Sequence, residues 1–372
     1  MVYLVGFLLI ALLGLAIAVA VRLQKVMGSI KSEDTQTEIP APNNKLNGAL
    51  WMAFLILGSI GVIWSYLSAR NYFLPEAASP HGRDTDSQFW FDMALLTIAF
   101  FIVNFLLFFF SWKYQYKKGY KATFYPENHK LEAVWTVIPA VIMAVLVFLG
   151  YRSWTTIMSE APNDSQVVEI MGKQFGWHVR YGGVVDNKLG NYNYKLCDDT
   201  GGNPMGIDFS DEASFDDISH PSEMYVEVGK PVALKIRARD VLHSVFIPHM
   251  RVKMDAVPGM PTKFWFIPDK STDQMRAELN NPNFDYEIAC TEVCGRGHFS
   301  MRMRLIVADK ATVDAWKQQQ KPVLASILET NPKFISKIPE ALREKAINYM
   351  PYVEEEEQAS TGTATSTGAS LR

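Results

Sequence analysis

The chain lacks a surplus of basic residues. Its 36 lysines and arginines are outnumbered by 39 aspartates and glutamates, and the formal net charge is -3 at pH 7. Because basic side chains must neutralise phosphates, this balance argues against nucleic acid as a partner. The sequence C-x-x-C-H is also missing from these 372 residues, which excludes a c-type haem attached to them. Cysteine is scarce, and three residues are too few for a four-cysteine structural zinc site.

Long apolar runs are confined to the first 151 residues. Four runs are each about long enough to cross a bilayer core of roughly 30 Å, at residues 2–21, 50–67, 89–112 and 133–151. They predict about four transmembrane helices in an α-helical N-terminal part. The first run could instead be a cleaved signal, although it lacks a positively charged segment before it.

Lysine and arginine cluster in two of the loops between these runs. Since such residues favour the cytoplasmic side, residues 22–45 and 113–130 are expected there. The loops hold Arg22, Lys25, Lys31 and Lys45, and Lys113, Lys117, Lys118, Lys121 and Lys130. Every segment after residue 151 is then expected on the outer face, whereas a cleaved signal would place residues 22–45 outside.

Residues 166–307 alternate between apolar and polar side chains, as half-buried strands do. In ALKIRAR, residues 233–239, Leu234 and Ile236 face one way and Lys235 and Arg237 the other. Prolines and glycines separate several such runs, and no amphipathic helical repeat interrupts them. The pattern predicts an all-β domain, either a small antiparallel sandwich or a Greek-key barrel.

The C-terminal part has a different composition. Residues from 311 to about 350 show a helical pattern, which predicts short surface helices. Residues 354–372 hold four glutamates followed mostly by small polar residues. This stretch is too poor in apolar side chains to offset its chain entropy, so we expect it to be disordered.

Two of the three cysteines lie in the stretch CTEVCGRGHFSM, residues 290–301. Soft thiolates select copper or zinc, and imidazole or thioether groups complete copper sites. Cys290, Cys294 and His298 fall short of the usual four-ligand structural zinc set, and zinc rarely binds methionine. A disulfide between the two cysteines is a further interpretation, because the outer face of a membrane can be oxidising.

The number of cysteines bears on the type of copper site. A single type-1 copper needs one cysteine, two histidines and usually one weak methionine ligand. Two cysteines could instead bridge two copper ions, each with one histidine and one weaker ligand. Such a site predicts a second histidine upstream. His243, in DVLHSVFIP, follows the strand predicted to end at Arg239 and fits this position.

Three motifs carry a specific resemblance. The spacing C-x3-C-x3-H-x2-M, preceded by DVLHS-x-x-x-P and by K-x-D-A-V-P-G-M, resembles subunit II of the haem-copper cytochrome c oxidases over roughly residues 89–308. The resemblance implies a membrane hairpin and a cupredoxin-like Greek-key sandwich with a binuclear copper centre, CuA. The expected parts are an extra membrane hairpin at 1–68, the family hairpin at 86–152, the CuA domain at 153–310, a helical extension at 311–353 and the disordered tail at 354–372.

The resemblance also implies a ligand set for two copper ions. Cys290 and Cys294 would bridge the ions, and His243, His298 and Met301 would be the remaining side-chain ligands. Glu292 would donate its backbone carbonyl to one copper. Its carboxylate would reach a magnesium or manganese ion at the boundary with subunit I, as suits a hard oxygen donor.

Three further residues take roles by resemblance. Glu132, at the cytoplasmic start of the fourth apolar run, matches the entrance of a proton-uptake channel that continues in subunit I. Its plainer interpretation is a carboxylate near a helix N-terminus, where negative charge is favourable. Phe175 and Trp177 would pass electrons to the centre, although the family commonly has tryptophan where Phe175 stands.

The implied function is that of an electron-transfer subunit in a proton-pumping oxidase. The chain would accept electrons from cytochrome c and pass them to haem in subunit I, which holds the oxygen-reducing site. Subunit III is a further expected partner, and the expected location is a bacterial plasma membrane with the CuA domain on the outer, periplasmic side.

A quinol oxidase subunit that has lost copper is a second hypothesis, and the complete ligand set argues against it. A membrane-tethered copper-delivery or structural module without an oxidase partner is a third hypothesis. Glu132 argues against it, because the role that the resemblance implies for this residue requires subunit I.

Residues 183–222 are strongly acidic, with eight acids against two lysines and a net charge of -6. Such loops are usually solvated surface, but near a copper site this one would steer a basic cytochrome c over a few Debye lengths of roughly 8 Å.

Cys197 in this loop has no matching partner and is expected to be an ordinary free thiol. His178 and His249 are expected to be surface or packing residues, and Met303 to be a core residue.

Overall fold

The computed structural model describes residues 14–15, 17–23, 41–117, 119–121, 123–183 and 188–348. Most of the predicted first span, residues 2–21, lies outside these described residues. The predicted disordered tail, residues 354–372, lies outside them as well, as does the end of the predicted helical extension.

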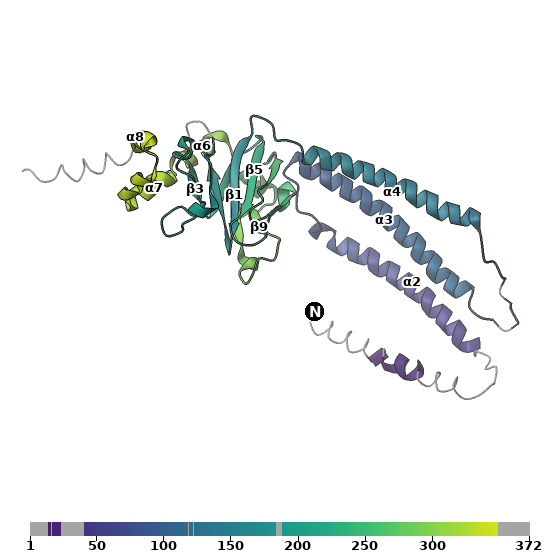
Figure 1. Ribbon diagram of the computed structural model, residues 1–372. Coiled ribbons are helices and arrows are strands. Elements are labelled where there is room, and N and C mark those ends of the chain that lie inside the picture. Colours follow the sequence, from purple (N-terminus) through teal and green to yellow (C-terminus); the bar gives the residue numbers. More distant parts are fainter. Residues whose placement is uncertain are drawn as a thin grey trace, which may run out of the picture. The chain divides into compact units, whose positions relative to one another are not determined.

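Three helices in the described part of the chain are long and apolar enough to cross a membrane. They are α2 (Ala41–Ala69), α3 (Pro80–Lys113) and α4 (His129–Ile157) (Figure 1). They contain the second, third and fourth apolar runs and confirm them as helices. Helix α3 begins nine residues before its apolar run, with proline at its first position, where the missing N–H costs no intrahelical bond.

The chain divides into two compact units, residues 1–66 with 99–125, and residues 67–98 with 126–372. In the first unit an aromatic contact joins α2 to the second half of α3. Trp51 stacks on Phe108 with ring centroids 5.5 Å apart, and Phe54 lies 5.3 Å from the same ring. Such pairs add to the packing of the two helices beyond the area they bury.

In the described part of the second unit, ten strands form two five-stranded sheets. The first sheet has the order β3 (Ile218–His220), β2 (Gly176–Tyr181), β1 (Gln166–Lys173), β5 (Val232–Ala238) and β8 (Thr262–Phe266). The second has the order β4 (Glu223–Glu227), β10 (Arg302–Ala308), β9 (Tyr286–Cys290), β6 (His243–Ile247) and β7 (Val252–Ala256). The predicted two-sheet sandwich is confirmed.

The strand directions need a correction, because the sandwich is not wholly antiparallel. Strand β1 pairs parallel with β5, and β10 pairs parallel with β4. Each pair is separated by a long stretch of chain, which lets the second strand return in the same direction. Strands joined by a tight hairpin must instead be antiparallel.

Short helices connect and extend the sandwich. They are η2 (Tyr194–Leu196), η3 (Glu212–Ser214), η4 (Pro248–Met250), α5 (Thr272–Glu278), η5 (His298–Ser300), α6 (Lys310–Gln318), α7 (Val323–Thr330), η6 (Pro332–Lys337) and α8 (Glu340–Asn348), where η marks a 3-10 helix. The last four confirm the predicted C-terminal helices.

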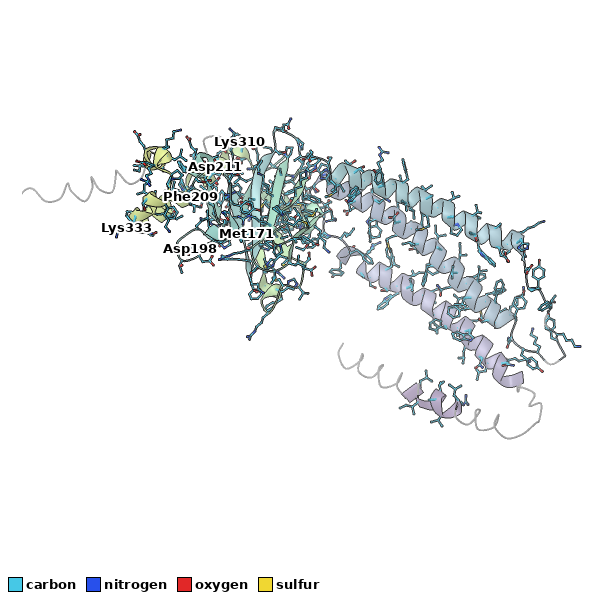
Figure 2. All side chains as sticks on the ribbon, in the orientation of Figure 1. Met171, Asp198, Phe209, Asp211, Lys310 and Lys333 are labelled. Atoms are coloured by element: carbon cyan, nitrogen blue, oxygen red, sulfur yellow. The ribbon has the colours of Figure 1, made fainter. Side chains whose placement is uncertain are left out.

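Two hydrophobic cores lie on opposite faces of the first sheet. Alternation along β1 shows this, because Ile170 belongs to the core shared with the second sheet, whereas Met171 belongs to the other core. The other core also contains Met205, Ile207, Phe209, Phe215, Val323, Leu324, Ile327, Leu328, Ile338 and Ala346. Figure 2 labels Met171 and Phe209 of this second core. Helix α7 therefore buries an apolar face against this second core, as an amphipathic helix at the surface of a globular domain does.

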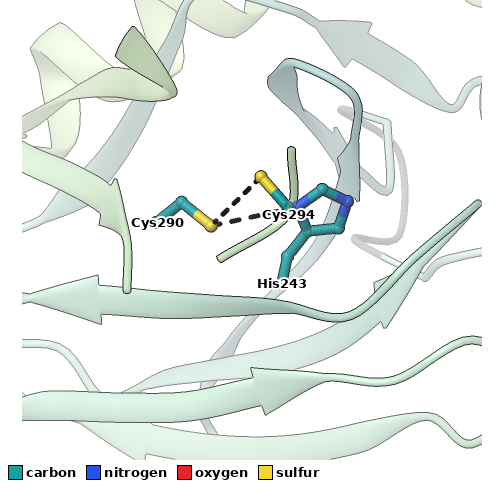
Figure 3. A group of neighbouring side chains, drawn as sticks. All are labelled: His243, Cys290 and Cys294. Atoms are coloured by element: carbon teal, nitrogen blue, oxygen red, sulfur yellow. Dashed lines mark hydrogen bonds between the residues drawn. The ribbon is translucent and has the colours of Figure 1, made fainter. Parts of the chain in front are cut away.

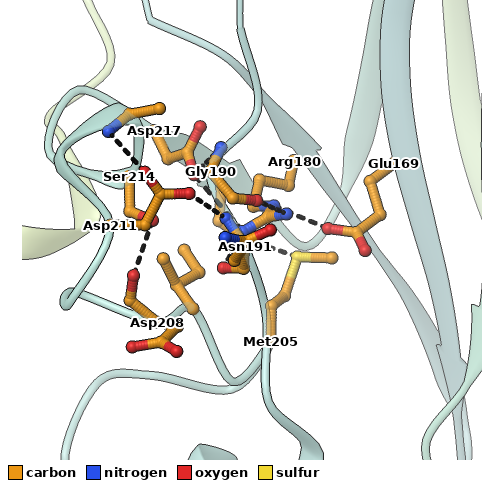
Figure 4. A network of polar contacts seen from close by, with 12 residues as sticks. Glu169, Arg180, Gly190, Asn191, Met205, Asp208, Asp211, Ser214 and Asp217 are labelled. Atoms are coloured by element: carbon orange, nitrogen blue, oxygen red, sulfur yellow. Dashed lines mark hydrogen bonds and ion pairs between the residues drawn. The ribbon is translucent and has the colours of Figure 1, made fainter.

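A buried charge network lies beside the second core (Figure 4). Glu169 of β1 is 2.6 Å from Nε of Arg180 and 2.6 Å from Nε of Arg237. Arg180 also lies 3.3 Å from a carboxylate oxygen of Asp217. Burial raises the pKa of Asp217 to about 7, against the lowering effect of Arg180. Asp217 and the buried Asp216 therefore do not belong to the solvated acidic surface predicted for residues 183–222.

Candidate metal centre

Two paired strands carry the first ligands. Strand β6 begins at His243 and β9 ends at Cys290, and Val245 lies opposite Cys290 in the antiparallel register. Cys294 follows in the loop after β9, His298 begins η5, and Met301 directly precedes β10. The connection from β9 to β10 thus brings the second set of ligands back to the start of β6, at His243.

The two cysteine sulfurs lie at the middle of the cluster. Sγ of Cys290 is 4.0 Å from Sγ of Cys294 and 3.9 Å from Nδ1 of His243 (Figure 3). It is also 3.3 Å from the carbonyl oxygen of Glu292. Sγ of Cys294 is 3.6 Å from Nδ1 of His298 and 3.9 Å from Sδ of Met301. Each sulfur therefore has one imidazole nitrogen and one weaker donor beside it.

The two cysteines are free thiols. Their sulfurs are 4.0 Å apart, whereas a disulfide bond is about 2.05 Å long. The disulfide considered from the sequence is therefore not formed.

The cluster is shielded from water. His243 is fully buried, and Cys290, Cys294 and Met301 are 8%, 5% and 1% exposed. Burial, followed by the charge of a neighbouring Cys290 thiolate, raises the pKa of Cys294 to about 11. A cation held by the two cysteines would offset this repulsion, so we expect metal binding to release the thiol protons.

The donor set suits copper. The ligand atoms of His243, Cys290 and Cys294 all lie within 4.8 Å of one another, close enough to hold a metal ion. Two thiolates, imidazole and thioether are soft or intermediate donors, which copper prefers, whereas carboxylate ligands would indicate magnesium or calcium. His298 and Met301 extend the same donor chemistry on the side of Cys294.

Residues around the ligands hold them in place. Asp240 accepts a hydrogen bond from Nε2 of His243 at 2.9 Å, which directs Nδ1 of that ring toward the sulfurs. The other carboxylate oxygen of Asp240 accepts from the backbone N–H of Gln174 at 2.7 Å. Although burial acts to raise it, these hydrogen bonds lower the pKa of Asp240 overall. The side chain of Gln174 donates to the carbonyl of Cys294 at 2.6 Å.

Sequence reasoning missed two of the residues that shape the centre. Gln174 ties the cysteine loop to β1, and no local pattern indicates this role. Gly172 of β1 leaves room for a ligand, because a Cβ there would lie 2.9 Å from two ring carbons of His243 and 2.9 Å from Trp177. The absence of a side chain in a strand interior can indicate close approach of another group.

The two aromatic residues predicted to pass electrons differ in exposure. Trp177 is 1% exposed and its ring centroid lies 6.0 Å from that of His243. Phe175 is 43% exposed and lies over Gly297, where an added Cβ would be 2.5 Å from its ring. Of the two, Phe175 is the one that presents its ring to the surface.

Exposed apolar side chains stand next to the ligands along the chain or, for Phe175, beside the cysteine loop. We call Phe175, Val241, Leu242, Val293 and Phe299 the apolar rim. Val293 and Phe299 are each 81% exposed, although they neighbour the buried Cys294 and the ligand His298 in the chain. Large apolar side chains left exposed beside a buried site are candidates for an interaction surface.

Glu132 lies away from the metal centre, in the first turn of α4. Its carboxylate accepts from the backbone N–H of Asn128 at 3.3 Å and lies 3.2 Å from Nδ1 of His129. These contacts agree with the plainer interpretation of a helix cap. The channel role stays a prediction.

The remaining sequence expectations have simple outcomes. Cys197 is a free thiol, as expected. Burial lowers the pKa of His178 and of His249 to about 4, which agrees with packing roles. Met303 is 3% exposed and belongs to the core of the sandwich. Asp255, the aspartate of the motif K-x-D-A-V-P-G-M, is exposed on β7 opposite Ser244.

The sequence matches two family descriptions in the order of the fold. "Cytochrome C oxidase subunit II, transmembrane domain" matches residues 67–153, and "Cytochrome C oxidase subunit II, periplasmic domain" matches residues 166–309. The chain is also 32% identical over 270 residues to "Alternative cytochrome c oxidase subunit 2" of Bradyrhizobium diazoefficiens, which covers 72% of this chain and 90% of that protein. The chain belongs to the cytochrome c oxidase subunit II family.

Further relatives of this subunit II chain include "Cytochrome c oxidase subunit 2" of Cereibacter sphaeroides, 28% identical over 264 residues, or 66% of this chain and 81% of that protein. A solved structure, the periplasmic domain of subunit II of cytochrome oxidase (CoxB) of Bradyrhizobium japonicum, is 21% identical with a TM-score of 0.29. That comparison covers 43% of this chain and 95% of that one. The family assignment confirms the resemblance found in the motifs.

Proposed function

We propose that this chain is the subunit through which electrons enter a proton-pumping cytochrome c oxidase, an enzyme complex of the translocase class. It accepts electrons from cytochrome c at a binuclear CuA centre and passes them to haem in subunit I, where oxygen is reduced to water. The observation that carries this proposal is a pair of unbonded, buried thiols 4.0 Å apart, each beside an imidazole nitrogen and a weaker donor.

Two copper ions held by Cys290 and Cys294 would supply a one-electron carrier whose charge is shared across both thiolates. The protein's contribution is rigidity. His243 and Cys290 lie on paired strands, and Asp240 fixes the orientation of the His243 ring. Ligands held in this way do not rearrange when the charge of the site changes, as fast electron transfer requires.

Glu292 serves the centre through its backbone carbonyl, which lies 3.3 Å from the Cys290 sulfur. Its side chain is exposed, so the carboxylate is accessible to a magnesium or manganese ion at the boundary with subunit I. Glu132 serves proton uptake at the opposite end of α4 from the sandwich, at the mouth of a channel in subunit I.

The donor, cytochrome c, docks on the apolar rim. Phe175 and Phe299 are the exposed aromatic rings of that rim, and Phe175 stands two residues before Trp177, whose ring centroid lies 6.0 Å from that of the ligand His243. Asp198 of the segment 188–222 remains exposed and steers a basic donor before contact, whereas Asp199 is paired with Lys173 and Arg239. This division assigns long-range attraction to charge and the final complex to apolar contact.

We place the chain in a bacterial plasma membrane with the CuA domain on the outer side. Three helices of membrane-spanning length and the match to a periplasmic-domain family support this location. Subunits I and III of the oxidase are the partners within the membrane. A quinol oxidase subunit without copper would have no need for five side-chain ligands and a buried thiol pair.

Replacement of one bridging cysteine tests the proposal. In the purified oxidase, Cys290→Ser should lower the copper content of this subunit and abolish oxidation of reduced cytochrome c. Cys197→Ser is the matched control, because Cys197 is a free thiol outside the cluster, and it should keep both the copper and the activity. Full copper loading and full activity in Cys290→Ser would refute the proposed role.

A further inference from the structure

The segment that precedes α3 is hydrogen-bonded to the loops that follow β6 and β8 of the sandwich. The N–H of Ala78 donates to the carbonyl of His249 at 2.7 Å, and the carbonyl of Ala78 accepts from the N–H of Asp269 at 3.1 Å. His249 follows β6 of the second sheet and Asp269 follows β8 of the first. One buried residue therefore bridges the two sheets. Ser79 adds a bond from its hydroxyl to the carbonyl of Met250 at 3.0 Å.

Arg251 locks this segment to α3. Its Nε and one terminal nitrogen contact the two carboxylate oxygens of Asp86, in α3, at 2.7 and 2.8 Å. The same guanidinium donates to the carbonyl of Pro75 at 2.6 Å and to that of Pro248 at 2.5 Å. The side chain of Arg251 is 10% exposed and that of Asp86 is 22% exposed. A planar fork saturated in this way fixes both distance and orientation, which a lysine cannot do.

The backbone around Arg251 is shaped for this contact. Arg251 has a φ of 53°, in the left-handed region that non-glycine residues rarely adopt. Gly82 permits a close approach, because a Cβ there would lie 2.9 Å from the Ser79 hydroxyl and 3.2 Å from Cγ of Arg251. The neighbouring pair of Lys270 and Glu76, at 3.4 Å, is more exposed, and such surface pairs contribute little.

The hairpin of β6 and β7, whose turn contains Arg251, also carries the ligand His243. Strand β6 runs from the ligand His243 to Ile247, and η4 then leads directly to Arg251. Strand β9, which pairs with β6, ends at the ligand Cys290. With a rise of about 3.3 Å per residue, a strand of this length separates the ligand end of β6 from the locked end by roughly 13 Å. The contact between Arg251 and Asp86 therefore fixes the distance of both ligand strands from the first turns of α3.

We propose that Arg251 is a positioning residue for electron transfer out of the metal centre. By holding β6 and β9 against Asp86 of the membrane helix α3, it sets the distance from the copper pair to the acceptor in the partner subunit. The inference rests on the proposed function. Electron transfer slows as the distance between donor and acceptor grows, so a shift of these strands relative to α3 lowers the rate.

The test compares Arg251→Gln with Arg251→Lys in the purified oxidase. Arg302→Gln is the matched control, since Arg302 forms an exposed pair with Glu287 at 3.4 Å on the second sheet. Four quantities are measured: the copper EPR signal, the rate at which cytochrome c reduces the centre, the rate of electron transfer from the centre to haem, and hydrogen exchange in residues 75–86.

We expect Arg251→Gln to keep the copper signal and the rate of reduction by cytochrome c. Its transfer rate to haem should fall severalfold, because the distance from the centre to the acceptor is no longer fixed, and exchange in residues 75–86 should rise. Arg251→Lys should lie between this variant and the wild type, and Arg302→Gln should match the wild type. Asp86→Asn, which keeps the bonds of Arg251 to Pro75 and Pro248, should show a smaller loss of the same kind.

An unchanged transfer rate in Arg251→Gln, with raised exchange in residues 75–86, would overturn the inference. Loss of the copper signal in both Arg251→Gln and Asp86→Asn would also overturn it, because the pair would then serve general folding. A wild-type protein without a copper signal would instead refute the proposed function, and the two failures are therefore distinguishable.

Discussion

Replacement of Gly172 by alanine probes the contact between the first sheet and the metal centre. The new methyl group would lie 2.9 Å from Cδ2 and Cγ of His243 and 2.9 Å from Cζ3 of Trp177, whereas ordinary van der Waals contact begins at 3.4 Å. Both neighbouring side chains are buried, at 0% and 1% exposure, so neither can move into solvent. The His243 ring must therefore shift relative to the cysteine sulfurs.

The expected free-energy change follows from two opposing effects. Overpacking of a filled core costs about 1–3 kcal/mol. Removing a glycine from a strand interior returns about 0.5–1 kcal/mol. We expect Gly172→Ala to lower the free energy of unfolding by about 0.5–2 kcal/mol, the difference between these effects. Copper binding should weaken in parallel, because one ligand ring is displaced.

Denaturant unfolding of the full chain in detergent, monitored by tryptophan fluorescence, gives the free energy of unfolding. Titration with copper gives the copper affinity. Gly176→Ala is the matched control, because no described atom lies within 4 Å of a Cβ at that position of the same hairpin. If Gly172→Ala has the stability and the copper affinity of the wild type while the control does too, the packing argument is refuted.

Two further predictions concern charged residues. Asp217 has a folded-state pKa of about 7 against an ordinary value of 3.8, so its contribution to stability is complete below pH 3.8 and is lost as the pH rises through 7. Asp217→Asn should therefore flatten the fall in unfolding free energy between pH 4 and 7, by up to about 1.4 kcal/mol per pH unit, and an unaltered slope in denaturation curves would contradict the assignment. Asp240→Asn should weaken copper binding by about 10–100-fold, since the carboxylate that orients His243 is replaced, and unchanged competition with a copper chelator would exclude that role.

Much of the fold follows from local patterns in the sequence. Apolar runs of span length predict α2, α3 and α4, and alternation predicts strands such as β5. The parallel pairing of β1 with β5 does not follow, because the register depends on contacts between Gln166 and Val232 and their neighbours, which are far apart in the chain. The second core has the same cause. Its residues Met205, Ile207 and Phe209 alternate with Gly206 and Asp208, but this alternation covers only five residues and does not continue on either side.

The ligands of the candidate site are predictable because they are few and chemically distinctive. Cys290, Cys294 and His298 lie within nine residues, and soft donors at that spacing favour copper. The residues that hold the ligands are common types in ordinary contexts. Gln174, Gly172 and Arg251 acquire their roles through partners as distant as 120 and 165 residues in the chain, as for Gln174 with Cys294 and Arg251 with Asp86. Only the three-dimensional arrangement identifies them.

The electron paramagnetic resonance spectrum of the oxidised, copper-loaded protein tests the central claim most directly. Two copper ions that share one unpaired electron across the thiolates of Cys290 and Cys294 should give a hyperfine pattern of seven lines. A four-line pattern from one isolated copper ion, in protein that is fully loaded, would contradict the account.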